Sequence, residues 1–158
     1  MKMVHNTKPV TGLAPITPST TTPDFVSMKG YQHLTIFVLA DNATTVTGSA
    51  ITLLQSTVVA GTDEKELAFT KVWQNVDTAA SDALVETAVA NNTFTTAAVD
   101  NKNSLYVIEV EADQLDVTND FDCVRIGTGD AVATVLSVLY VLSEPRYTSA
   151  TPPTAITD

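Results

Sequence analysis

The stretch AVATVLSVLYVL, from Ala131 to Leu142, is the longest apolar run in the sequence and contains no charge, no Gly and no Pro. Apolar side chains occur on both of the faces that an alternating strand would present. Its β-branched residues suit the packed surface of a sheet, and its 12 residues are too few for a membrane-spanning helix, which needs about 20. We therefore predict an interior strand that is covered on both faces.

Further strands are predicted by alternating apolar segments upstream of this run. They span residues 31–39, 50–56, 67–73, 105–112 and 121–126. Asp, Asn and Gly between them are typical of turns. Residues 77–99 fit either a short helix or a hairpin; their many Thr and Val residues favour a hairpin, with a turn at Asn91-Asn92. These segments, about eight strands in all, predict an all-β fold, a single β-sandwich or jelly-roll-like domain with extended N- and C-terminal arms.

The alternation also predicts which side chains point inward. In 105–112 the apolar set should face the core, while Glu109 and Glu111 face out. That inward set is Tyr106, Ile108, Val110 and Ala112. In 67–73 the pattern places Leu67, Phe69 and Trp73 on one face. The single Trp favours a core position, and the alternative is a contact with a sugar or a partner.

Polar segments rich in Pro flank the predicted domain, which spans residues 30–145. Each Pro removes a backbone donor and favours extended geometry, so residues 1–29 and 146–158 are predicted to be extended arms. The sequence is compatible with two alternatives, a disordered tail and an arm that binds a neighbouring subunit. Partner-binding candidates lie in these arms, among them Arg146 and Tyr147, whose residue types are favoured at interfaces. The candidates are Pro15, Pro18, Pro23, Phe25, Arg146, Tyr147 and Ile156.

Charge restricts the classes of partner. Eight basic and 18 acidic residues give a net charge of −10. No basic stripe is present to displace the counterions of nucleic acid, and an anionic membrane surface is disfavoured for the same reason. An acidic shell favours solubility and could face a basic partner. The N-terminus lacks the apolar core of a signal peptide, so we expect synthesis in a cytoplasm.

Residues that could carry chemistry are sparse, and no catalytic, cofactor or metal residues are predicted. The two histidines are His5 and His33, and no nucleophile-elbow pattern accompanies them. Four aspartates lie between Asp113 and Asp122, but the EF-hand spacing and its central Gly are missing, which favours a solvated loop. The single Cys123 cannot form an internal disulfide and is expected to be a buried, inert thiol.

Several phrases are similar to those of a known class of proteins. They are LLQS (53–56), LAFTKVW (67–73), LYVIEVEADQLDV (105–117), FDCVRI (121–126), VLYVLSEPRY (138–147) and PPTAITD (152–158). Together, over residues 30–158, they resemble small virion proteins of tailed bacteriophages that are encoded near the head genes. Such proteins are structural, so the resemblance implies a subunit that decorates or cements a capsid, and it implies no catalytic residues.

The same resemblance implies the partners and the location. The partners would be the major capsid protein or other virion proteins, with self-association as a trimer by analogy, and the location would be the virion. One alternative is a neck or tail component of the virion. Another is a carbohydrate- or receptor-binding sandwich that uses Trp73 or the tyrosines as a platform. An enzyme would need a deep pocket with convergent ionisable groups.

Overall fold

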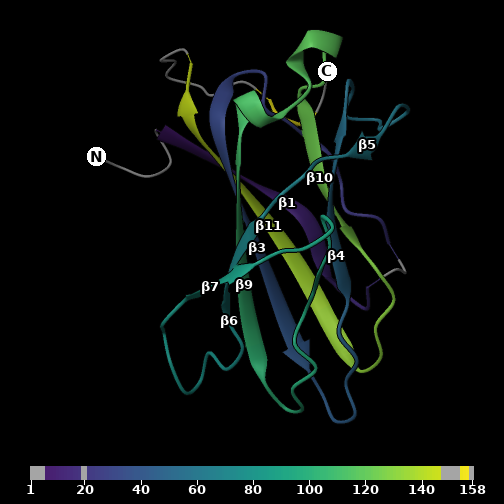
Figure 1. Cartoon of the computed structure of the whole chain (residues 1–158), viewed down its shortest axis with the longest axis vertical. Coiled ribbons are helices and arrows are strands. Elements are labelled where there is room, and N and C mark those ends of the chain that lie inside the picture. Colours follow the sequence, from purple (N-terminus) through teal and green to yellow (C-terminus); the bar gives the residue numbers. More distant parts are fainter. Residues whose placement is uncertain (1–5, 19–20, 147–153, 157–158) are drawn as a thin grey trace.

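The computed structural model describes residues 6–18, 21–146 and 154–156. Two antiparallel sheets pack against each other (Figure 1). The larger has six strands in the order β1-β11-β3-β9-β6-β7, and the smaller has five, in the order β2-β10-β4-β5 with β8 also paired to β4. This architecture confirms the predicted all-β sandwich.

The strands of the larger sheet are β1 (Thr7–Ile16), β3 (Tyr31–Asn42), β6 (Lys71–Asn75), β7 (Val85–Ala88), β9 (Asn103–Glu111) and β11 (Thr134–Pro145). Those of the smaller sheet are β2 (Val26–Ser27), β4 (Ala50–Ser56), β5 (Lys65–Glu66), β8 (Phe94–Thr95) and β10 (Cys123–Thr128). Two short 3-10 helices, η1 (Ala112–Gln114) and η2 (Val117–Asn119), connect β9 to β10. Among the described residues, no helix has the length and apolarity needed to cross a membrane.

Strand β11 contains residues 134–142 of the long apolar run. It is an interior strand as predicted, paired with β1 on one side and with β3 on the other. Its even-numbered residues from Thr134 to Leu142 are buried. The expectation that both faces are covered is wrong, because Val135 and Leu139 are each 37% exposed. A two-layer sandwich covers only the inner face of each sheet.

The first part of the N-terminal arm belongs to the sandwich. Residues Thr7–Ile16 are extended and form β1, an edge strand of the larger sheet, in a register that runs from Thr7 opposite Ser143 to Ile16 opposite Leu136. An edge strand tolerates Pro, and Gly12 is required because a Cβ there would lie 2.4 Å from the ring of Tyr140. The arm is therefore anchored to its own chain over these residues.

Part of the C-terminal arm is also held by the domain. The side chain of Ala155 is completely buried, and its carbonyl accepts a hydrogen bond of 2.7 Å from the backbone N–H of Ser27 in β2. The neighbouring Ile156 is 56% exposed. Residues 154–156 of this arm thus lie beside β2 of the smaller sheet.

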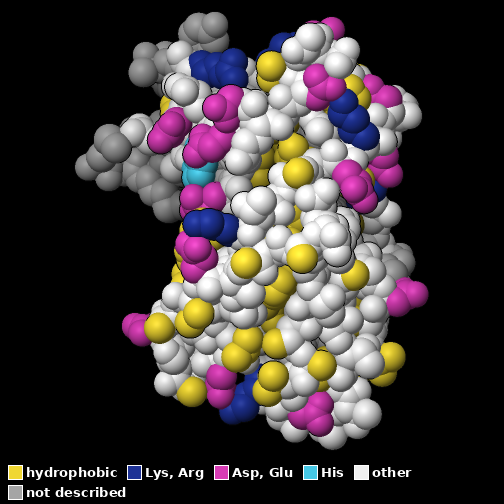
Figure 2. All heavy atoms as spheres, viewed as in Figure 1, with side chains coloured by type: hydrophobic (Ala, Val, Ile, Leu, Met, Phe, Trp, Pro, Cys, Tyr) yellow, Lys and Arg dark blue, Asp and Glu magenta, His cyan; other side chains and the backbone are white. Residues whose placement is uncertain are grey.

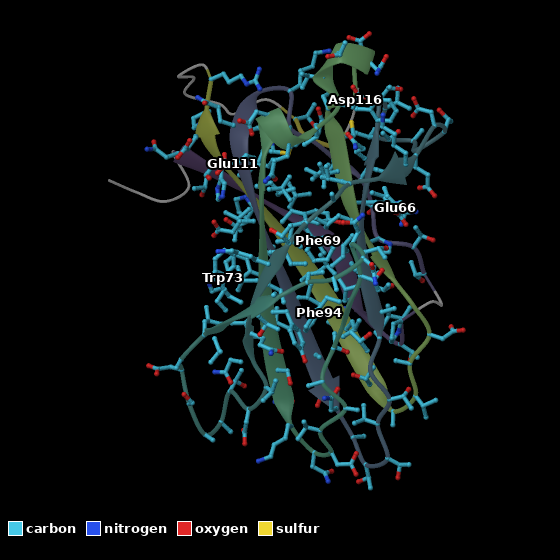
Figure 3. All side chains as sticks on the ribbon, viewed as in Figure 1. Glu66, Phe69, Trp73, Phe94, Glu111 and Asp116 are labelled. Carbon is cyan, nitrogen blue, oxygen red and sulfur yellow. The ribbon has the colours of Figure 1, made fainter. Side chains whose placement is uncertain are left out.

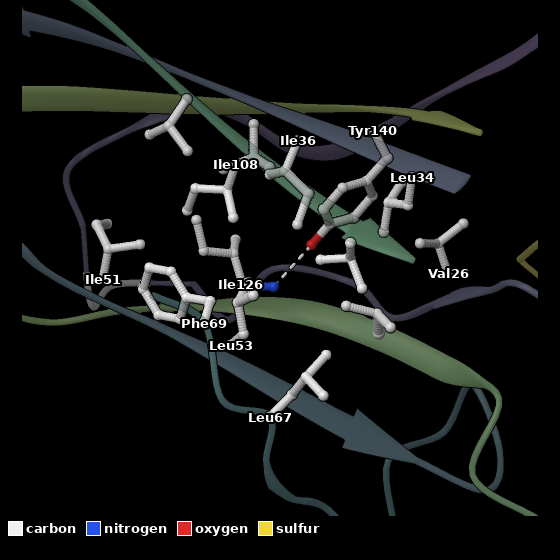
Figure 4. Packing of buried hydrophobic residues seen from close by; sticks show 14 of the residues in the cluster. Val26, Leu34, Ile36, Ile51, Leu53, Leu67, Phe69, Ile108, Ile126 and Tyr140 are labelled. Atoms are coloured by element: carbon white, nitrogen blue, oxygen red, sulfur yellow. Dashed lines mark hydrogen bonds between the residues drawn. The ribbon is translucent and has the colours of Figure 1, made fainter. Parts of the chain in front are cut away.

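The core lies between the two sheets (Figure 4). The inward set predicted for β9 and η1, which includes Tyr106 and Ile108, is buried as predicted, and Glu109 and Glu111 are exposed. Two core tyrosines satisfy backbone donors: Tyr140 accepts the N–H of Ile126 at 3.0 Å, and Tyr106 accepts that of Ala97 at 2.8 Å. Cys123 is fully buried, as expected.

The predicted strand 67–73 begins later than expected. Leu67 and Phe69 are buried, but so is Val72, and Trp73 is only half-buried, so Leu67, Phe69 and Trp73 do not share a face. The chain crosses here from β5 in the smaller sheet to β6 in the larger one, and β6 begins at Lys71. Because the backbone changes sheets, the strict alternation of one continuous strand does not apply.

Residues 77–99 form strands and not a helix. The turn at Asn91-Asn92 is confirmed, since both residues have positive φ angles of 55° and 54°, a conformation that Asn tolerates. The hairpin itself is limited to a bridge between Ala90 and Thr93. Strand β7 pairs with β6 and strand β8 with β4, so the chain turns here from one sheet to the other.

Candidate functional site

The outer face of the six-stranded sheet carries an unusual set of side chains. We use this name for the side chains that point away from the five-stranded sheet on β11, β3, β9, β6 and β7. One row across it joins Leu139, Phe37, Val107 and Trp73, each opposite the next in the pairing register. In Figure 3, Trp73 lies on the far side of this sheet from Phe69 in the core.

Several apolar side chains of this face are open to solvent. Leu39 is 48% exposed, and Val135 and Leu139 are 37% exposed each. They come from the neighbouring strands β3 and β11, where the next row places Ser137 opposite Leu39. Single exposed hydrophobic residues are common on proteins, but a group of them on adjacent strands makes this face a candidate site of interaction.

A shallow groove of about 460 Å³ lies over this apolar region. Its apolar lining includes Pro15, Leu39, Leu105 and Val135, and its polar lining includes Asp41. The groove brings the end of β1 together with β3, β9 and β11. Pro15 is thus one of the predicted partner-binding residues that the structure places at this site, and it is exposed.

A polar cluster occupies the other end of the same face. The imidazole of His33 lies 3.3 Å from a carboxylate oxygen of Glu109 and 3.7 Å from one of Glu111 through Nε2, and 3.0 Å from the hydroxyl of Ser143 through Nδ1. In Figure 2 the histidine side chain lies between acidic side chains in the upper half of the molecule. Ser143, His33 and Glu111 are neighbours in one row of the sheet.

Serine, histidine and glutamate are also the residue types of hydrolytic triads. Here they lie on the surface of a sheet, and none of them lines the cavities of about 390, 330 and 460 Å³ found in the described residues. Within that part of the chain, no group of three or more His, Cys, Asp or Glu side chains is arranged to hold a metal ion. The arrangement therefore gives this face a polar, acidic end.

A lysine beside the apolar row is neutralised. Lys71 on β6 forms an ion pair of 2.9 Å with Glu86 on β7, both half or more exposed. On these five strands the outer face therefore presents one lysine against the carboxylates of Asp41, Glu86, Glu109 and Glu111, with His33 between two of them. Its net character is acidic around an apolar centre.

The depression of about 390 Å³ on the opposite sheet has a different character. Thr52 on β4 and Gly127 on β10, which are opposite each other, form part of its floor. Its one charged lining residue, Arg125, is paired with Glu64 at 2.6 Å and lies 5.1 Å from the ring of Phe25. Since that guanidinium already has its counter-ion and an aromatic neighbour, the depression carries no free charge for a ligand.

The remaining predicted partner-binding residues are dispersed. Pro18, Pro23 and Phe25 are buried by their own chain, so their side chains are not open to a partner in this conformation. Arg146 is exposed, and its backbone N–H donates to the carbonyl of Gly30 at 2.9 Å. Ile156 is exposed beside β2, and Tyr147 lies outside the described residues.

Comparisons with known proteins identify no relative. No protein-family model, no curated protein and no solved structure matches this chain. The class that the structure defines is an all-β sandwich with an exposed apolar sheet face.

Proposed function

We propose that the protein is a non-enzymatic structural protein of a virion, a subunit that decorates or cements a phage capsid through protein–protein contacts. The observation that supports this proposal is the outer face of the six-stranded sheet, where Leu39, Val135 and Leu139 are exposed on neighbouring strands. An apolar sheet face with a polar rim has the composition of a protein interface. The resemblance of the sequence to small phage virion proteins supplies the biological setting.

The proposed partners are the major capsid protein or other virion proteins. A decoration subunit has to bind without unfolding, and the anchoring of Thr7–Ile16 and Ala155 to the domain supports a preformed surface. Pre-organised partners lose little conformational entropy on binding. Self-association into a trimer stays a prediction by analogy.

Virus particles purified from the source of the chain provide the test. We expect an antibody against the recombinant protein to label the particles, and mass spectrometry to detect the chain in a fixed ratio to the major capsid protein. Absence from the particles, with the chain present in the infected cells, would contradict the virion assignment. Labelling of necks or tails alone would support the alternative position in the particle.

A carbohydrate-binding module is the second candidate because of Trp73. Sugar-binding sites stack aromatic rings against the ligand, and the ring of Trp73 lies on a solvent-facing sheet surface, half-buried beside Val107. A glycan array decides between the two: binding that Trp73→Ala abolishes and Leu139→Ser leaves unchanged would favour the carbohydrate-binding role.

A further inference from the structure

We infer that the outer face of the six-stranded sheet docks a protein surface with an apolar centre and a rim of lysine and arginine, and that it does not dock a second copy of this chain. This inference rests on the proposed function in one respect, namely that the protein acts by binding another protein. It adds the location of the site and the chemistry of the partner.

The apolar centre is formed by Leu139, Phe37 and Trp73, which are partly exposed around the buried Val107. The row of Leu139, Phe37, Val107 and Trp73 crosses four strands, and the exposed Leu39 lies next to it on β3. Burial of apolar area supplies about 25 cal/mol for each Å² removed from water. A partner that covers this patch therefore needs apolar side chains at the centre of its own surface.

The rim selects the charge of the partner. At one end Glu109 and Glu111 flank His33, and at the other Asp41 lies in the last row of the face, opposite Val135. The one lysine on these strands is already paired with Glu86. Lysine and arginine on the partner would be attracted to both ends, and opposite charges at a rim raise association rates and exclude wrong partners.

A second copy does not fit these ends. In a face-to-face pair with parallel strands, Glu109 and Glu111 would meet the same residues of the other copy. With antiparallel strands they would approach Asp41. Either arrangement brings carboxylates together, in a chain that already carries a net charge of −10. Like charges placed opposite each other across an interface disfavour the complex.

Trp73 supplies a direct readout, because it is the one tryptophan in the chain and belongs to the apolar row. The probe is a capped synthetic peptide of alternating leucine and lysine. We expect it to shift the fluorescence of Trp73 to shorter wavelength, with an affinity that falls as salt is added. Two control peptides separate the contributions: leucine alternating with glutamate keeps the apolar side chains, and serine alternating with lysine keeps the charge.

Variants locate the binding to this face. Leu139→Ser and Leu39→Ser should each weaken binding about tenfold, the loss expected for one partly buried leucine. Replacing Glu109 and Glu111 by Gln should weaken binding and flatten its salt dependence. Val117→Ser is the matched control, because Val117 is 58% exposed on η2, away from the strands of this face. Circular dichroism and the thermal midpoint verify that each variant is folded.

Three results would overturn the inference. They are equal binding of the leucine–glutamate peptide, unchanged affinity of both leucine variants, and a dimer in sedimentation that Leu139→Ser dissociates. The proposed function is tested separately by binding of the protein to virus particles. If particles bind wild type and Leu139→Ser equally, the proposed function stands and the proposed site is wrong. If the peptide binds but the particles do not, the proposed site stands and the proposed function is wrong.

Discussion

The hydroxyl of Tyr140 accepts a hydrogen bond of 3.0 Å from the backbone N–H of Ile126, and this bond joins the two sheets through the core. Strand β2 pairs with β10 only at Cys123 and Val124. The N–H of Ile126 lies beyond the end of that pairing. The tyrosine hydroxyl of one sheet therefore completes the backbone hydrogen bonding of the other.

The first prediction concerns this bond. Tyr140→Phe leaves the buried N–H of Ile126 without an acceptor, so we expect the free energy of unfolding to fall by about 1–3 kcal/mol, measured by urea denaturation. Tyr31→Phe is the matched control, because the Tyr31 hydroxyl is buried and has no hydrogen-bond partner among the described residues. That variant should be neutral or slightly more stable, and equal losses in both would contradict the role given to the bond.

The second prediction concerns stability in alkali. Burial raises the pKa of Tyr140 well above its ordinary value of 10.0, and burial also raises the pKa of Tyr106. Below pH 10 both states keep these protons; above it the unfolded state loses them first, so stability falls as the pH rises. The expected slope is about 1.4 kcal/mol per pH unit for each such tyrosine.

Urea unfolding at a series of pH values above the ordinary tyrosine pKa measures this slope. Tyr140→Phe should reduce this slope by about 1.4 kcal/mol per pH unit, the contribution of one proton. An unchanged slope in the variant would show that Tyr140 titrates in the folded protein. Tyrosine absorbance, recorded in parallel, should show buried hydroxyls ionising only as the protein unfolds.

The third prediction concerns acid. The carboxylate of Asp63 accepts hydrogen bonds from the hydroxyls of Thr57 and Ser56, both at 2.7 Å, and from the N–H of Thr57 at 3.1 Å. These bonds hold its pKa below the ordinary value of 3.8. Their contribution to stability is present above that value and is lost as the pH falls through the lowered pKa.

An NMR titration of the Asp63 carboxyl group measures the lowered pKa directly. Asp63→Asn should reduce stability at neutral pH and reduce its loss on acidification. Asp113→Asn, at an exposed carboxylate on η1, serves as the control. It should change neither the stability at neutral pH nor the loss of stability on acidification. An Asp63 that titrates at its ordinary value would refute the prediction.

The fourth prediction concerns the C-terminal contact. Ala155→Asp places a carboxylate at a completely buried position, which should lower stability by about 2 kcal/mol or more, or else release the segment from β2. Hydrogen exchange at the N–H of Ser27, which donates to Ala155, measures that release. Ile156→Asp, at an exposed neighbour, should change little; equal effects of the two substitutions would contradict the contact.

Much of the fold could be predicted from local patterns. Alternation in 105–112 correctly oriented Tyr106 and Glu109 because β9 is a regular strand with one buried face. The same rule failed at Trp73, because the chain changes sheets just before β6. The pairing of Thr7–Ile16 with β11 could not be predicted either, because it joins segments far apart in sequence and its register is carried by no local motif.

The candidate site was largely hidden in the sequence. The apolar character of Val135 and Leu139 is visible in the sequence, but it predicts a second buried face, whereas both residues are exposed. The row that contains Leu139, Phe37 and Val107 exists only because β11, β3 and β9 are neighbours in that register. Of the predicted partner-binding residues, Pro15 lines this site. One signal in the sequence could have pointed to this site. A strand that is apolar on both faces must expose one of them in a two-layer sandwich, because only the inner face of each sheet is covered.

The order of the strands also has a consequence for synthesis on the ribosome. Strand β11, at Thr134–Pro145, is the last strand of the described residues, yet it inserts between β1 and β3, the first two strands of its sheet to be made. Until it emerges, both early strands expose an unpaired backbone edge that can pair with another nascent chain. The six-stranded sheet can therefore form completely only after Pro145 has been translated, so its early strands are open to mispairing for longer than those of a sandwich built from sequential hairpins.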